Sequence, residues 1–156
     1  LDELRTDVRK VVAELRDTLY DLRTEVTESH GLAATLEDFL QRVGRRSGLD
    51  TELDADETAR LPVLRERELW RIARDALTSA ERDAGASRIS VSFRCDGHRA
   101  ELEIADDGRG FDADTGGSLG SQRLAALRER AASIGASLAV VAEPDGGTRV
   151  RCTLVG

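Results

Sequence analysis

The segment ADDGRGF, residues 105–111, places two acids and two glycines directly after an alternating apolar run. If that run is a strand ending at Ala105, Asp106 stands at the mouth of a sheet, where a side chain can face a cleft. Gly108 and Gly110 allow close backbone approaches that a β-carbon would prevent. A carboxylate beside bare backbone suits a ligand with an exocyclic amine, such as adenine. The other interpretation is a polar turn, and the motif alone leaves both open.

Three oxygen-bearing side chains recur at four-residue spacing earlier in the chain. Asp75, Ser79 and Asp83 lie within residues 64–84, whose apolar side chains follow helical periodicity. Side chains four residues apart line up on one face of a helix, so these three share a predicted face. They form a second set of polar side chains that a ligand could meet.

The first 26 residues contain neither Gly nor Pro. Leu1, Leu4, Val8, Val11, Leu15 and Leu22 fit the a and d positions of a heptad, and most other side chains are charged. This pattern predicts a long amphipathic helix that needs a partner helix. The alternative is a helix that folds back on its own domain.

Periodicity and turn signals predict the remaining elements. Helices are expected at 32–43, 64–84 and 124–134, and strands at 88–94, 100–105, 137–142 and 148–155. A weaker strand candidate is 48–54, followed by a loop at 54–63. This order predicts an α+β fold, a two-layer sandwich with a mixed, mostly antiparallel sheet, helices on one face, and the long amphipathic helix preceding it.

Composition narrows the class of protein. The chain has 156 residues, a net charge of −7 and a pI near 5.0, which argues against general binding to nucleic acid or anionic membranes. No apolar run approaches the roughly 20 residues that span a bilayer, and no signal peptide is evident. Two cysteines in strand-like runs favour a reduced, cytosolic setting. Because the chain begins inside a helix without Met, it reads as part of a longer protein.

Four segments occur in a distinctive order: ELWRIARDALTSAERDAGASRISVSF, IADDGRGF, LRERAASIGASLAV and GGTRVRCTL. In this order, residues 64–156 resemble the ATP-binding catalytic (HATPase_c) domain of sensor histidine kinases, which shares the GHKL or Bergerat fold with gyrase, heat-shock chaperone and mismatch-repair ATPases. The pattern LRERAASIG followed by GGT is typical of kinases that pair with LuxR/NarL-type response regulators. RDTLYDLR resembles the second helix of their dimerisation bundle. The resemblance divides the chain into residues 1–28, part of that bundle, and 29–156, the ATP-binding domain.

The resemblance implies roles at the adenine end of a nucleotide site. Asp106 would accept a hydrogen bond from the adenine amino group. Gly108 and Gly110 would let the loop pass close to the nucleotide. Thr148 would support the adenine from the facing strand, through water.

The resemblance also implies roles at the phosphate end, where the sequence departs from the family. Asp75 stands where the family has a catalytic acid, usually Glu. Residues 112–122 would form a lid over the phosphates, with Gly117 and Gly120 as nucleotide contacts. The lid usually closes with Gly-x-Gly-Leu, and here residues 121–124 read SQRL.

The metal position departs as well. Ser79 replaces an Asn that helps the family hold Mg²⁺, and Asp83 replaces a His or Lys. One hypothesis is a rebuilt metal site in which Asp83 supplies the missing oxygen, since Mg²⁺ prefers hard oxygen ligands. The other, which we favour, is a weakened site, because an added carboxylate repels phosphates.

The implied function is phosphoryl transfer from ATP, with Mg²⁺, to a His on a dimerisation helix outside these residues. This segment alone is therefore not expected to autophosphorylate. The expected partners are a second copy through the N-terminal helix and a LuxR/NarL-type response regulator, in the cytoplasm and without direct nucleic-acid or membrane contact. The alternative is a non-catalytic relative that serves as a docking or dimerisation module with weak or no nucleotide binding. An anti-sigma-factor kinase fits the first helix less well.

Overall fold

The computed structural model describes residues 2–82, 85–108, 120–143 and 146–155, and its elements follow the predicted order. The helices are α1 (Asp2–Arg23), α2 (Leu32–Ser47), α3 (Val63–Arg82) and α4 (Gly120–Ser133). The strands are β1 (Asp50–Ala59), β2 (Arg88–Asp96), β3 (Ala100–Asp106), β4 (Ala136–Ala142) and β5 (Thr148–Leu154).

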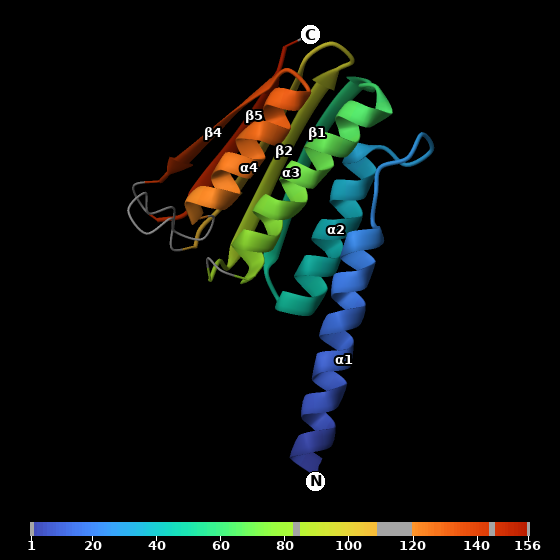
Figure 1. The fold of residues 1–156 in the computed structure, drawn as a ribbon, viewed down its shortest axis with the longest axis vertical. Helices are drawn as coiled ribbons and strands as arrows, with labels where there is room; N and C mark the ends of the chain where they lie inside the picture. The colour runs from blue at the N-terminus through green and yellow to red at the C-terminus, as the bar shows by residue number, and fades with distance from the viewer. Residues whose placement is uncertain (1, 83–84, 109–119, 144–145, 156) are drawn as a thin grey trace.

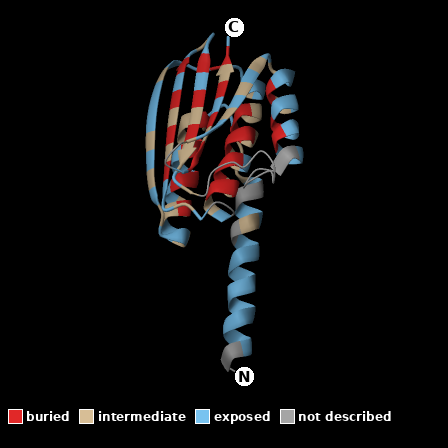
Figure 2. Ribbon diagram, turned by 90° about the vertical axis from the view of Figure 1, so that its left-hand side faces the viewer, coloured by how far each residue is buried: buried red, intermediate tan, exposed pale blue. Residues whose placement is uncertain are grey.

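The strands form one sheet in the order β1-β2-β3-β5-β4. The β1–β2 pair is parallel, and the other pairs are antiparallel. Helices α2, α3 and α4 cover one face of the sheet (Figure 1), and buried residues occur on both the helices and the strands of these two layers (Figure 2). The predicted two-layer α+β sandwich with a mostly antiparallel sheet is therefore confirmed.

The first strand is longer than the sequence predicted. In place of a short strand at 48–54 and a loop at 54–63, β1 pairs with β2 over its ten residues, with one irregularity near its end. The acidic sequence of β1 lacks the apolar alternation by which a strand is predicted. An edge strand needs few apolar side chains when its acids can pair with basic side chains of the neighbouring strand. Arg94 of β2, for example, donates to the Asp54 carboxylate across the pair at 2.8 Å.

Aliphatic side chains fill the core, with two aromatic rings where α2 meets α3. Phe39 and Trp70 are both buried and meet edge to face, with ring centroids 5.3 Å apart. The indole N–H of Trp70 donates to the Thr24 carbonyl at 3.0 Å. Trp70 therefore packs the core and also holds the chain that leaves α1.

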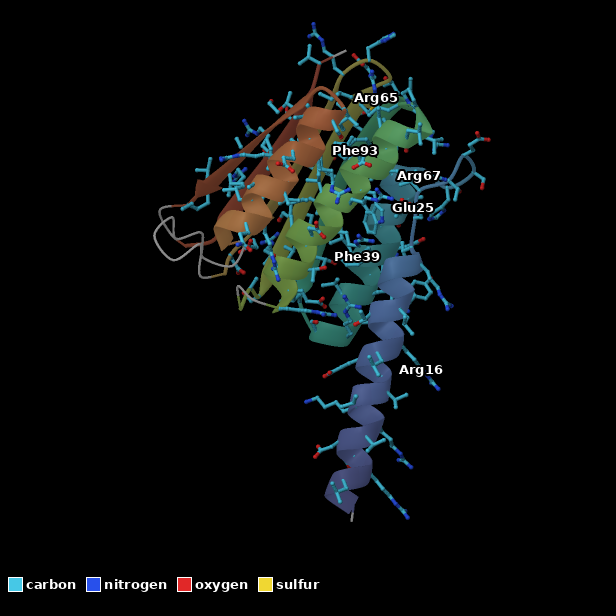
Figure 3. All side chains as sticks on the ribbon, in the orientation of Figure 1. Arg16, Glu25, Phe39, Arg65, Arg67 and Phe93 are labelled. Carbon is cyan, nitrogen blue, oxygen red and sulfur yellow. The ribbon has the colours of Figure 1, made fainter. Side chains whose placement is uncertain are left out.

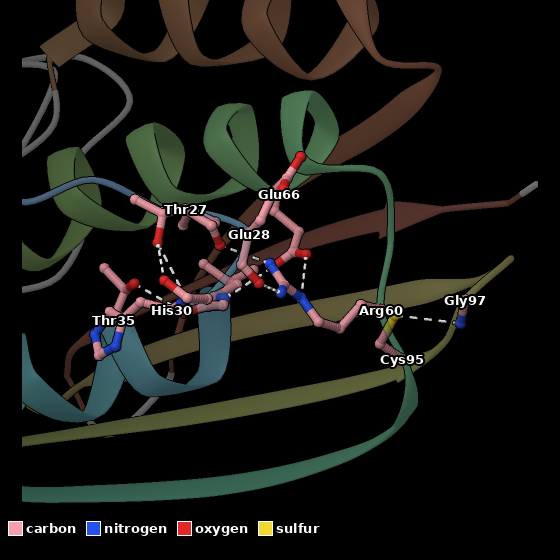
Figure 4. Close-up of polar contacts among 12 residues, drawn as sticks. Thr27, Glu28, His30, Thr35, Arg60, Glu66, Cys95 and Gly97 are labelled. Atoms are coloured by element: carbon pink, nitrogen blue, oxygen red, sulfur yellow. Dashed lines mark hydrogen bonds and ion pairs between the residues drawn. The ribbon is translucent and has the colours of Figure 1, made fainter.

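Glu66 organises the junction between α1 and α2 from a fully buried position on α3. Its carboxylate accepts the Leu32 N–H at 2.8 Å, at the start of α2, and the Arg60 Nε–H at 2.9 Å. Arg60 in turn donates to the carbonyl oxygens of Thr27 and Glu28 (Figure 4). One buried acid thus ties the junction, the α2 start and the loop before α3 together.

Helix α1 extends beyond the body of the domain (Figure 1), and its Arg16 side chain projects away from it (Figure 3). Leu4, Val8, Val11 and Leu15 are between 52% and 65% exposed. The described chain therefore leaves this apolar stripe uncovered, which favours the partner-helix interpretation over a helix folded back. Among the residues that the structure describes, no helix is long and apolar enough to cross a membrane.

Candidate functional site

The topology brings the predicted polar residues to one end of the sheet. Asp106, the last residue of β3, lies opposite Thr148, the first residue of β5. On its other side it pairs with Ile89 at the start of β2, which follows α3 in the chain. The end of α3 and the start of α4 lie at this same end (Figure 1).

The Asp106 side chain faces the helix layer because it continues the buried alternation of Leu102 and Ile104 along β3. Its Oδ1 accepts the Gly108 N–H at 2.9 Å. Burial raises the pKa of Asp106, and the neighbouring charge of Asp107 raises it further, while backbone N–H groups of Gly108 and Thr148 lower it. Within the described residues, backbone donors orient this carboxyl, which suits it to accept a hydrogen bond from a ligand.

The second acid of the motif has a structural role. Asp107 accepts the backbone N–H groups of Ser87 and Arg88 at 2.8 and 2.9 Å, and the Ser87 hydroxyl at 2.6 Å. The hydrogen bond from the Ser87 side chain is the largest effect that lowers the pKa of Asp107. The two adjacent carboxylates thus differ in role: Asp107 stabilises the start of β2, and Asp106 faces the candidate site.

Thr148 supplies an unpartnered polar atom opposite Asp106. Its side chain is buried, and its Oγ1 has no hydrogen-bond partner within the described part of the chain. A buried hydroxyl without a partner costs stability, so such a group marks a place where a ligand or a water can bind. A carboxyl acceptor and a free hydroxyl on facing strands match the edge of a base such as adenine.

Two glycines before β5 complete this end of the site, and sequence reasoning did not select them. Gly147 has φ +97°, and a β-carbon on it would lie 2.0 Å from the Asp106 carbonyl oxygen. Gly146 has φ +96°, and its β-carbon would lie 3.4 Å from the Gly108 carbonyl oxygen. The sequence GGT at residues 146–148 could have indicated them, but it was used only as part of the family resemblance.

The predicted residues of α3 differ in their surroundings: Ser79 is buried against α4, whereas Asp75 is exposed. Ser79 is 1% exposed, and its Oγ accepts Arg123 Nη1–H of α4 at 3.0 Å. Asp75 is exposed and borders a pocket of about 310 Å³ between α1, α3 and α4. The pocket is lined chiefly by Thr18, Arg74, Asp75, Thr78, Arg82 and Arg123.

Of the two predicted Mg²⁺ ligands, only Ser79 lies among the described residues. Ser79 presents its hydroxyl to a guanidinium, which repels a metal cation. In those residues no group of three His, Cys, Asp or Glu side chains could hold a metal. Asp83 lies outside the described residues, so its predicted oxygen stays untested.

The predicted lid is only partly described. Gly110 and Gly117 lie outside the described residues, and Gly108 follows β3 as expected. Gly120 is the first residue of α4, which begins four residues before the predicted start at 124. The predicted helix began at Leu124, the first apolar residue of the helical repeat. The first turn of α4 is polar, so apolar periodicity does not reveal it.

Comparison with known proteins identifies the class of this site. Residues 65–155 match the family model of histidine kinase-, DNA gyrase B- and HSP90-like ATPases. The sensor histidine kinase MctS of Rhizobium johnstonii is 35% identical over 114 residues, which cover 72% of this chain and 25% of that protein. The nitrate/nitrite sensor protein NarX of Escherichia coli K12 is 28% identical over 99% of this chain and 26% of its own length. The chain thus spans about a quarter of each.

Solved structures agree with the sequence matches. The histidine kinase domain of the blue-light-activated kinase EL346 from Erythrobacter litoralis superposes with a TM-score of 0.61 at 26% identity, over 80% of this chain and 60% of that domain. The histidine kinase AdeS of Acinetobacter baumannii shares the fold, with a TM-score of 0.58 at 15% identity, over 97% of this chain and 83% of that one. The chain therefore belongs to the family of histidine kinase-, DNA gyrase B- and HSP90-like ATPases and resembles the ATP-binding region of sensor histidine kinases.

Proposed function

We propose that the chain binds ATP and is the ATP-binding catalytic region of a sensor histidine kinase. The observation that carries this proposal is the half-buried Asp106 carboxyl opposite the Thr148 hydroxyl, which has no hydrogen-bond partner among the described residues. The adenine amino group donates to Asp106, and Thr148 supports the base directly or through water. Membership of the ATPase family supports this assignment.

The phosphates extend from the adenine towards the pocket that Asp75 borders. Gly108 and Gly110 let the loop after β3 approach the nucleotide, and Gly117 and Gly120 belong to the lid over it. Because the pocket adjoins Thr18 of α1, the γ-phosphate would face the helical bundle, where a His accepts it. Asp75 is the proposed catalytic acid for that transfer.

Titration with a fluorescent ATP analogue tests the adenine contact. Asp106→Asn should weaken binding about tenfold or more, because a charge-assisted hydrogen bond is lost. Glu101→Gln is the matched control, since it makes the same chemical change at an exposed position of β3. Equal affinities for the two variants would refute the adenine contact.

Mg²⁺, with Ser79 and Asp83 as its ligands, stays a prediction drawn from the resemblance, although the Ser79 hydroxyl already accepts a hydrogen bond from Arg123. Titrations of ATP in EDTA and in Mg²⁺ test it directly. An affinity that rises with Mg²⁺ and falls in a Ser79→Ala variant would support that ligand set. An affinity that is the same in both solutions would refute it.

The proposed kinase function also implies a division of the chain into two parts and two protein partners. Residues 1–28 belong to a dimerisation bundle and 29–156 to the ATP-binding domain, so two copies meet through α1. A His on the bundle receives the phosphoryl group and passes it to a LuxR/NarL-type response regulator in the cytoplasm. In the full-length protein, Asp75→Asn should slow phosphohistidine formation without weakening the binding of the ATP analogue.

The second candidate function is a docking or dimerisation module without catalysis. The Arg123–Ser79 hydrogen bond favours it, since it occupies the position where the family holds a metal. The two candidates differ in one measurement. A full-length protein that dimerises but neither binds ATP nor forms phosphohistidine would establish the module and refute the kinase.

A further inference from the structure

Ser79 and Arg123 join the two helices at the phosphate end of the proposed site. The Ser79 side chain is buried on α3, and its hydroxyl accepts the guanidinium N–H of Arg123 at 3.0 Å. A buried hydroxyl with this partner holds the α4 arginine against α3. The position that would hold a metal cation therefore already lies beside a positive charge.

The neighbouring pocket concentrates further positive charge. Arg74 and Arg82 lie eight residues apart on α3, with Thr78 between them, so the three side chains share one face. Arg123 closes the pocket from α4, and Asp75 is the one acid among the residues named as its lining. Three arginines against one carboxylate leave the lining with a net charge of about +2 at neutral pH.

A guanidinium is well suited to phosphate, because it presents parallel N–H donors that bind two oxygens of one group. The pocket volume of about 310 Å³ lies at the lower end of the roughly 300–1,000 Å³ of small-ligand sites. The threonine hydroxyls of Thr18 and Thr78 add neutral donors. The lining thus matches an oligophosphate chain better than it matches a divalent cation.

We propose that Arg123, positioned by Ser79, acts with Arg74 and Arg82 to bind the phosphates of the nucleotide without Mg²⁺. This proposal rests on the ATP-binding function above, and it replaces the metal bridge of the resembling family with arginine side chains. Ser79 is a positioning residue, since it acts through Arg123.

Isothermal titration calorimetry with three probes tests the proposal: ATP, adenosine and inorganic tripolyphosphate, each in EDTA and in Mg²⁺. ATP and tripolyphosphate should bind in EDTA with no gain from Mg²⁺. Arg123→Gln should weaken both about tenfold or more and leave adenosine binding unchanged, because only phosphate contacts are lost. Arg74→Gln is a second variant whose effect should point the same way.

Arg128→Gln is the matched control, since it removes the same charge from an exposed position on α4. Binding that requires Mg²⁺, or equal affinities for Arg123→Gln and Arg128→Gln, would overturn the arginine proposal and leave ATP binding intact. Conversely, arginine-dependent tripolyphosphate binding without any adenosine binding would refute the adenine site and uphold the arginine pocket. If no probe binds, both proposals fail.

Discussion

The backbone at Gly147 lies against the backbone of Asp106, so that a β-carbon on Gly147 would sit 2.0 Å from the Asp106 carbonyl oxygen. No side chain can occupy that space unless the strands move apart. The contact occurs where the two strands of the proposed adenine site begin and end. The distance between Asp106 and Thr148 therefore depends on a glycine that carries no chemistry itself.

Gly147→Ala should weaken binding of an ATP analogue at least tenfold and lower thermal stability. Gly146→Ala is a close control, because its φ of +96° is nearly that of Gly147 but its β-carbon would lie 3.4 Å from the nearest atom. Both variants carry backbone strain of about 1–2 kcal/mol, and only Gly147→Ala adds the clash. Equal binding and equal melting temperatures for the two would contradict this account.

Asp107→Asn should lower the melting temperature, whereas Asp106→Asn should leave it almost unchanged. Asp107 loses charge-assisted hydrogen bonds to Ser87 and Arg88, while burial already disfavours the ionised form of Asp106. Thermal melting at pH 7 measures the difference. A larger loss of stability for Asp106→Asn would reverse the roles assigned to the two acids.

Regular periodicity made most of the fold predictable from the sequence. Helix α3 and strands β2 and β3 carry apolar side chains at helical or alternating spacing, and their ends fall within a few residues of prediction. Strand β1 departed from prediction beyond residue 54 because the acids of an edge strand pair with arginines of its neighbour. Because charged residues occupy most positions of this strand, its sequence shows no apolar alternation from which a strand could be predicted.

The places of Asp106 and Thr148 at strand ends could be predicted from the sequence, whereas the contact between Ser79 and Arg123 could not. Asp106 directly follows one predicted strand, and Thr148 begins another. Arg123 of α4 lies 44 residues from Ser79, and no spacing rule connects two helices so distant in sequence. Gly147 was missed because its requirement comes from the backbone of another strand.

Glu81→Gln should destabilise the domain by about 2–3 kcal/mol at pH 7, since a buried carboxylate loses its charge-assisted pair. Arg46 donates to both Glu81 oxygens at 2.7 Å, joining α2 to α3. Burial alone would raise the pKa of Glu81, but the hydrogen bonds from Arg46 and Ser47 hold it below its ordinary 4.5. The ionised form therefore stabilises the folded state above pH 4.5, and that contribution is lost as the pH falls through the lowered pKa.

Urea unfolding at pH 7 and at several values below 4.5 measures this dependence. The gap in unfolding free energy between the native chain and Glu81→Gln should narrow as the solution becomes more acidic. Glu129→Gln, an exposed position on α4, should show no such gap at any pH. A gap that is constant with pH would mean that Glu81 contributes by packing alone.

Glu66→Gln should cost about 2–3 kcal/mol of stability, because its fully buried carboxylate loses the charge that pairs with the partly exposed Arg60, and the α2 start is weakened. Glu52→Gln breaks an ion pair whose two side chains are each 61% exposed, and it should change stability by less than about 0.5 kcal/mol. Amide hydrogen exchange should also increase at Leu32 in Glu66→Gln. Unchanged exchange there would show that the carboxylate does not hold the junction.

Self-association should depend on the uncovered stripe of α1. A Leu4→Glu/Val8→Glu variant places two charges where apolar side chains are 65% and 60% exposed, so a dimer formed through α1 should dissociate while the melting temperature of the domain stays constant. Leu64→Glu is the control, since Leu64 is 73% exposed but lies on α3, away from the stripe. Analytical ultracentrifugation over a range of concentrations distinguishes the two. A native chain that stays monomeric, or a double variant that still dimerises, would show that α1 is not the surface through which two copies meet.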